Sequence, residues 1–61
     1  MTPSQQKFYI LGLQVAIREI KIESECSEYV MQGEALNAHQ FTCDICVGAI
    51  NDLIEATRNN L

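Results

Sequence analysis

The sequence has no tryptophan, one proline, three glycines and only four basic residues among 61 positions. Proline and glycine most often interrupt regular structure, so their scarcity favours long helices. The four basic residues do not cluster, and this disfavours direct DNA or RNA binding, which usually rests on a basic patch. The longest strongly apolar run, Phe8–Leu13, contains Gly12 and falls far short of the about 20 residues that cross a membrane. We therefore expect neither a nucleic-acid nor a membrane partner.

Sequence features of catalysis are equally scarce. The chain has no glycine-rich phosphate loop, and its one histidine, His39, belongs to no catalytic triad pattern. Cys43 and Cys46 have the spacing of a redox motif, but no predicted strand precedes them. A chain of about 60 residues buries only roughly 60% of its unfolded surface, which leaves little room for a catalytic cleft. We predict that the protein is not an enzyme.

The N-terminal residues, Met1–Lys7, lack the basic start and the small-residue cleavage site of a secretory signal. This pattern predicts a cytoplasmic protein. Three cysteines are expected to stay reduced in that compartment. Their odd number also argues against a fully paired disulfide framework.

The start of a first helix is clearly marked. Thr2 and Gln5 have the spacing of a capping box, and Pro3 stands at the first helical position. No later proline follows, and the first interruption comes at Gly33, a residue that tolerates the left-handed conformation at helix ends. The sequence therefore predicts a helix over residues 3–31.

A second helix start is predicted at Asn37, which forms a second capping-box pattern with Gln40. Leu36 and Phe41 flank this cap as a hydrophobic staple would, and Arg58 suits the negative end of the helix dipole. A competing register extends the first helix through Leu36 and turns at Asn37. The predicted single domain, residues 1–61, consists of a helix over 3–31, a turn over 32–37 and a helix over 38–58.

At about 100° per residue, the first predicted helix carries two separate apolar stripes. The first stripe is Phe8, Leu11, Val15, Ile22, Cys26 and Tyr29. The second stripe is Ile10, Leu13, Ala16, Ile17, Ile20 and Met31. The second predicted helix carries one wide apolar arc, made by Ala38, Cys43, Ile45, Cys46, Val47, Ala49, Ile50, Leu53, Ile54 and Ala56. One neighbouring helix can cover only one of the two stripes.

The uncovered stripe indicates a partner. Burying a large aliphatic side chain contributes about 1.5–3 kcal/mol, and leaving several exposed invites aggregation. We therefore predict an all-α fold, an antiparallel two-helix hairpin that dimerises into a four-helix bundle. The sequence leaves open which stripe packs within the chain, and a different protein covering the same stripe is the alternative. The predicted dimer interface comprises Phe8, Ile10, Leu13, Ile17 and Ile20.

A histidine and three cysteines form the one constellation with metal-binding character. His39, Cys43 and Cys46 have spacings that share a helix face. If the turn centres near residues 34 and 35, Cys26 lies opposite Cys43, and one histidine with three thiolates suits tetrahedral zinc. A small zinc-binding helical protein is therefore an alternative function. The cysteines have two other interpretations. They are reduced thiols in an apolar core, or Cys26 forms a disulfide with Cys43 or Cys46.

Acidic side chains give the chain a net charge of −4, and several lie on the first predicted helix. Glu19, Glu23 and Glu28 form the surface on which we expect a basic host or phage protein to bind. The acidic residues have two alternative interpretations. They form a solvated surface without a partner, or the chain is an acidic inhibitor of a DNA-binding protein.

In size, predicted helicity, acidic charge and its Thr2–Gln5 start, the chain resembles the small accessory proteins from the early regions of lambda-like temperate phages. The resemblance covers no alignable motif, so it carries over no functional residue. It implies a helical protein of the host cytoplasm that binds a host or phage protein and modulates host or phage development. Together with the two stripes, it predicts a small protein–protein interaction or regulatory module.

Overall fold

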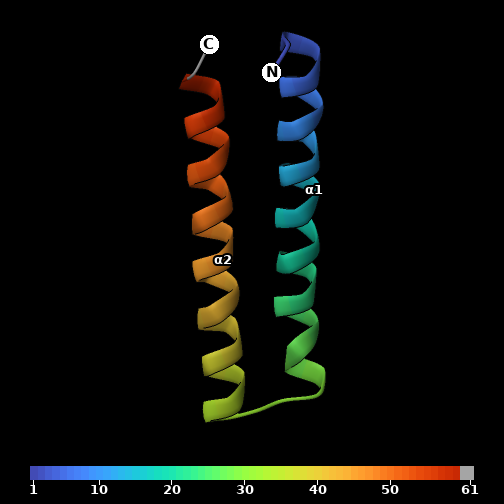
Figure 1. Cartoon of the computed structure of the whole chain (residues 1–61). Coiled ribbons are helices and arrows are strands. Elements are labelled where there is room, and N and C mark those ends of the chain that lie inside the picture. Colours follow the sequence, from blue (N-terminus) through green and yellow to red (C-terminus); the bar gives the residue numbers. More distant parts are fainter. Residues whose placement is uncertain (60–61) are drawn as a thin grey trace.

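The computed structural model describes residues 1–59, which form two long antiparallel helices joined by a short turn (Figure 1). The elements are α1 (Pro3–Cys26), a short 3-10 helix η1 (Ser27–Tyr29) and α2 (Glu34–Asn59). No strand occurs within residues 1–59. The prediction of an all-α helical hairpin is therefore confirmed. Asn60 and Leu61, which belong to the predicted domain, lie outside the described residues.

The start of α1 matches its prediction. The Thr2 backbone N–H donates to Gln5 Oε1 at 2.9 Å, and the Gln5 backbone N–H donates to Thr2 Oγ1 at 3.2 Å. Pro3 occupies the first helical position. This reciprocal pair satisfies backbone donors that would otherwise lack partners at the helix start.

The end of α1 does not match its prediction, because the helix stops at Cys26 rather than near residue 31. The Ser27 hydroxyl donates to the Ser24 carbonyl at 2.6 Å. Such a local side-chain bond competes with the regular helical hydrogen bonds. The chain tightens there into η1, and the Met31 N–H donates to the Ser27 carbonyl at 2.9 Å.

The turn contains the predicted break at Gly33, which adopts a φ of 67°, the left-handed region that favours glycine. The second helix nevertheless begins at Glu34, not at 38. The Asn37 N–H donates to the Gly33 carbonyl at 3.1 Å, so Asn37 lies inside α2 and is not its cap. The predicted turn over residues 32–37 and the competing turn at Asn37 are therefore both wrong.

The hairpin has a thin core. Within residues 1–59, the buried apolar side chains are Cys43, at 8% exposure, and Ile54, at 5%. Gln6 is also buried, and its Nε2 donates to the Thr57 carbonyl at the open end of the hairpin. A layer of two helices buries little side-chain volume, because most of each helix surface faces outward (Figure 1). No helix of the described residues is both long and apolar enough to cross a membrane.

The two apolar stripes of α1 have different surroundings. The second stripe packs toward α2, and its helical members are only partly exposed; we call it the inner stripe: Ile10, Leu13, Ala16, Ile17 and Ile20. The first stripe points away from α2, and its large apolar residues within α1 are between 41% and 66% exposed; we call these four residues the outer stripe: Phe8, Leu11, Val15 and Ile22. The hairpin thus covers one stripe and leaves the other in solvent.

Candidate interaction surfaces

Three contacts between the helices fix their register. Besides the Gln6–Thr57 bond, Gln40 Nε2 donates to the Ser24 carbonyl at 3.4 Å, and Glu23 Oε1 lies 3.9 Å from His39 Nε2. This register places Cys26 near the level of Asn37, and Cys43 near the level of Ile20. The prediction that Cys26 lies opposite Cys43 is wrong, because the turn lies at residues 30–33 rather than at 34 and 35.

The three cysteines lie in different environments. Cys43 is buried, with its Sγ 3.8 Å from His39 Nε2, whereas Cys26 and Cys46 are exposed, and all three are free. Among the described residues, no group of three His, Cys, Asp or Glu side chains is placed to hold a metal ion. The predicted four-residue zinc site is therefore not assembled within this chain. The core-thiol interpretation fits Cys43 alone.

The packing of α1 within the hairpin involves most residues of the predicted dimer interface. Four of its five residues belong to the inner stripe and pack against α2 within the chain: Ile10, Leu13, Ile17 and Ile20. Phe8, the fifth, belongs to the outer stripe and is exposed. The sequence left open which stripe packs within the chain, and the helix register decides this because it turns the inner stripe toward α2.

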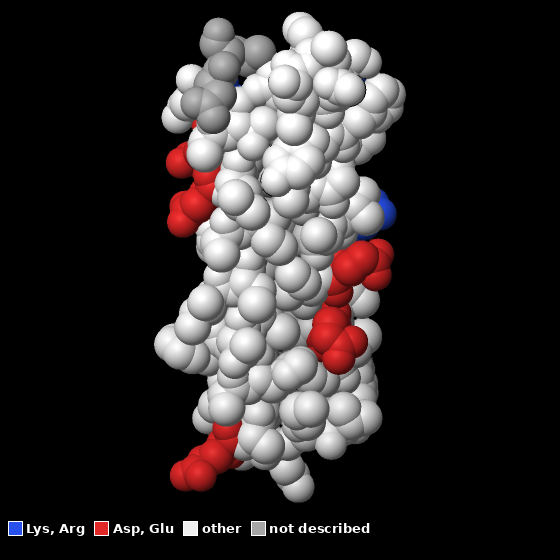
Figure 2. Space-filling view, in the orientation of Figure 1, with Lys and Arg blue, Asp and Glu red and all other residues white. Residues whose placement is uncertain are grey.

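The two broad sides of the hairpin differ in charge. The Glu23–His39 contact marks one side, which we call the front face. At helical spacing from Glu23 and His39, this face contains Tyr9, Gly12 and Ala16 of α1 and Cys46, Ala49 and Leu53 of α2. Figure 2 shows a broad side with an uncharged middle, acidic side chains at the edges and very little basic surface.

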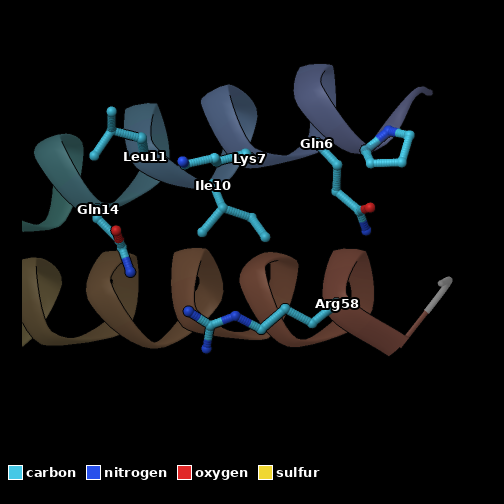
Figure 3. Close-up of a pocket in the computed structure, with 7 residues that line it drawn as sticks. Gln6, Lys7, Ile10, Leu11, Gln14 and Arg58 are labelled. Atoms are coloured by element: carbon cyan, nitrogen blue, oxygen red, sulfur yellow. The ribbon is translucent and has the colours of Figure 1, made fainter.

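The opposite side contains the basic groups. A shallow groove of about 400 Å³ lies there at the open end, with Lys7 of α1 and Arg58 of α2 in its lining (Figure 3). Ile10 and Gln14 point from α1 toward α2 within this groove. Arg18 and Lys21 follow Lys7 and Gln14 at helical spacing along the same edge of α1. All four basic residues therefore lie away from the front face.

The predicted acidic surface is open to solvent. Glu19, Glu23 and Glu28 are all exposed, and the Glu23 side chain retains 71% of its accessible surface beside His39. Glu19 and Glu23 share the front edge of α1, whereas Glu28 lies in η1 at the closed end. Within residues 1–59, Glu19 and Glu28 make no ion pair.

The front face is the surface that sequence reasoning missed, because it combines residues of both helices. Its members on α2 were grouped in one apolar arc with residues that pack inward, such as Ile54. A predicted start of α2 at Glu34, directly after Gly33, instead of at residue 38, would have given the correct register between the helices. Comparisons of the chain with protein-family models, with curated proteins and with solved structures found no match.

Proposed function

We propose that this chain is a small, non-enzymatic protein–protein interaction module whose working form is a homodimer, arranged as a four-helix bundle. The supporting observation is its exposed area of 4724 Å². A compact monomer of 6.9 kDa exposes about 4,000 Å², so the hairpin presents about 700 Å² in excess. A standard protein interface buries about 800 Å² on each partner. The excess is close to the area that one dimer contact removes from water.

The thin core supports the same proposal. Within residues 1–59, the buried apolar groups Cys43 and Ile54 are too few to offset the conformational entropy lost when these residues become ordered. A second hairpin adds a second layer of helices and gives the apolar residues of α2 a neighbour. The folding unit is then larger than the chain.

Sedimentation equilibrium of the purified chain tests the dimer. We expect the mass of two chains at micromolar concentration, and a urea midpoint that rises with protein concentration because dissociation and unfolding are linked. A folded monomer at these concentrations, with a midpoint independent of concentration, would contradict the proposal.

A basic host or phage protein is the proposed partner of the dimer, with Glu19, Glu23 and Glu28 as its contact surface. Capture from a bacterial lysate should be lost when these three residues are changed to lysine, because attraction becomes like-charge repulsion. The matched control makes the same charge change on α2, at Asp44, Asp52 and Glu55. If both triple variants lose the same captured protein, or if neither does, the acidic contact surface is wrong.

A further inference from the structure

We propose that the front face is a self-association surface, and that its occupant is the front face of a second copy of this chain. This inference rests on the proposed homodimer and adds which side of the hairpin forms the contact. The front face consists of Tyr9, Gly12 and Ala16 of α1 and Cys46, Ala49 and Leu53 of α2.

The distribution of charge favours the front face. A protein interface has an apolar centre that lacks charged groups and a polar rim. The front face has this arrangement, because its members toward the open end of the hairpin are uncharged, whereas Glu23 and His39 lie together toward the closed end and Glu19 lies at the α1 edge. Pairing the opposite sides would instead take Lys7, Arg18 and Lys21 out of water, and burying charges carries a large desolvation cost.

The shape of the front face also favours a second hairpin. Gly12, Ala16 and Ala49 have small side chains or none, so the backbones of two helix layers can approach closely there. Tyr9 and Leu53 remain 41% and 48% exposed, and each supplies apolar area that a second layer would bury. The Cα atoms of the hairpin extend 45 Å by 15 Å, so a contact through the broad side can run along the length of both helices.

The outer stripe is a poorer self-association surface. It lies on one helix, so a contact through it would pair α1 with α1 and leave α2 without a second neighbour. Arg18 lies within the stripe between Val15 and Ile22, and an antiparallel pair would bring the Lys7 and Lys21 edges of two copies together. A contact through the front face involves both helices of each chain and avoids that repulsion.

Two cysteines allow the front face and the outer stripe to be distinguished experimentally. Cys46 lies at the middle of α2 on the front face. Cys26 is the last residue of α1, and its spacing from Val15 and Ile22 places it on the same side of α1 as the outer stripe. Both are exposed in the hairpin. Dimerisation through the front face therefore covers Cys46 and leaves Cys26 open.

The test is alkylation of the full chain with N-ethylmaleimide above and below the dimer dissociation constant, with each site followed by tandem mass spectrometry. We expect the dimer to slow Cys46 alkylation at least tenfold and to leave the Cys26 rate within twofold. Slowed Cys26 with unchanged Cys46, or equal rates at both concentrations, overturns the front-face contact.

A pair of variants gives an independent readout. Ala49→Arg places a charge at the centre of the front face, and Val15→Arg places the same charge in the outer stripe; both positions are exposed in the hairpin. Sedimentation should show at least a 100-fold weaker dimer for Ala49→Arg and less than a threefold change for Val15→Arg. The reverse order overturns the inference while the homodimer stands. A native chain that is monomeric refutes the homodimer itself, and with it the contact.

Discussion

The inner and outer stripes of α1 are similar in composition but not in surroundings. Each contains large aliphatic residues at helical spacing, and a reader of the sequence has no reason to prefer one. In the hairpin, the inner stripe packs against α2, while the outer stripe stays between 41% and 66% exposed. The difference shows that the apolar pattern of a helix indicates how many of its sides need a neighbour. The pattern does not indicate which neighbour covers each side.

The largest expected effect comes from the buried side of the hairpin. Ile54→Ala removes one of the two apolar side chains that are buried within residues 1–59, and we expect a loss of about 2–5 kcal/mol in the free energy of unfolding. Urea denaturation followed by circular dichroism, at one fixed protein concentration, measures this loss. The control, Phe41→Ala, truncates a larger but exposed side chain of α2 and should cost less than about 1 kcal/mol. Similar losses for both variants would mean that a partner copy covers Phe41.

The two stripes themselves can be compared with one substitution each. Ile17→Ala shortens an inner-stripe residue, and we expect about 1–3 kcal/mol of destabilisation because its contact with α2 is lost. Ile22→Ala makes the same change in the outer stripe and should stay within about 0.5 kcal/mol. The same urea experiment serves both. Equal losses of stability in the two variants would contradict this difference, and would mean that another chain covers the outer stripe.

The turn that separates the stripes depends on one glycine. Gly33→Ala should destabilise the chain by about 1–2 kcal/mol, because a Cβ is strained at a φ of 67°. Gly48→Ala should stabilise it by about 1 kcal/mol, because alanine favours a helix interior and the added Cβ meets nothing within 4 Å. Thermal unfolding midpoints give both signs. If both substitutions shifted the midpoint in the same direction, the turn geometry would be wrong.

The smallest expected effect concerns the start of the helix that carries both stripes. Thr2→Ala removes the acceptor of the Gln5 N–H bond, and we expect a loss of about 1 kcal/mol. Thr2→Ser keeps a hydroxyl and should retain most of that stability. Both stripes should be affected together, since the cap stabilises α1 as a whole. Amide hydrogen exchange along α1 would record this, and faster exchange confined to one side of α1 would contradict it.

Much of the hairpin followed from local chemistry. The capping box at Thr2, the break at Gly33 and the basic last turn at Arg58 all depend on residues close in the chain, and the structure has all three. The boundaries near the turn were predicted less well. Ser24 and Ser27 end α1 early through a local hydrogen bond, and Gly33, rather than Asn37, directly precedes α2.

The errors of a few residues in the predicted end of α1 and start of α2 had a large consequence for the candidate site. They shift the level at which α1 meets α2, so Cys26 does not face Cys43, and no three of the predicted zinc ligands come together, although His39 and Cys43 are in contact. A helix rotates by about 100° with each residue, so a small displacement of the turn changes which side chains meet.

The sequence by itself determined that the chain forms two helices, and that the first of them has apolar side chains on two sides. Helix formation depends on caps, breaks and spacing within a few residues, and all of these can be read along the chain. Only the tertiary structure decided that Ile17 faces α2 and Ile22 faces solvent, and that Cys46 shares a face with Tyr9. These assignments depend on the register between two helices, which contacts between residues far apart in the chain fix, such as the bond from Gln6 to Thr57.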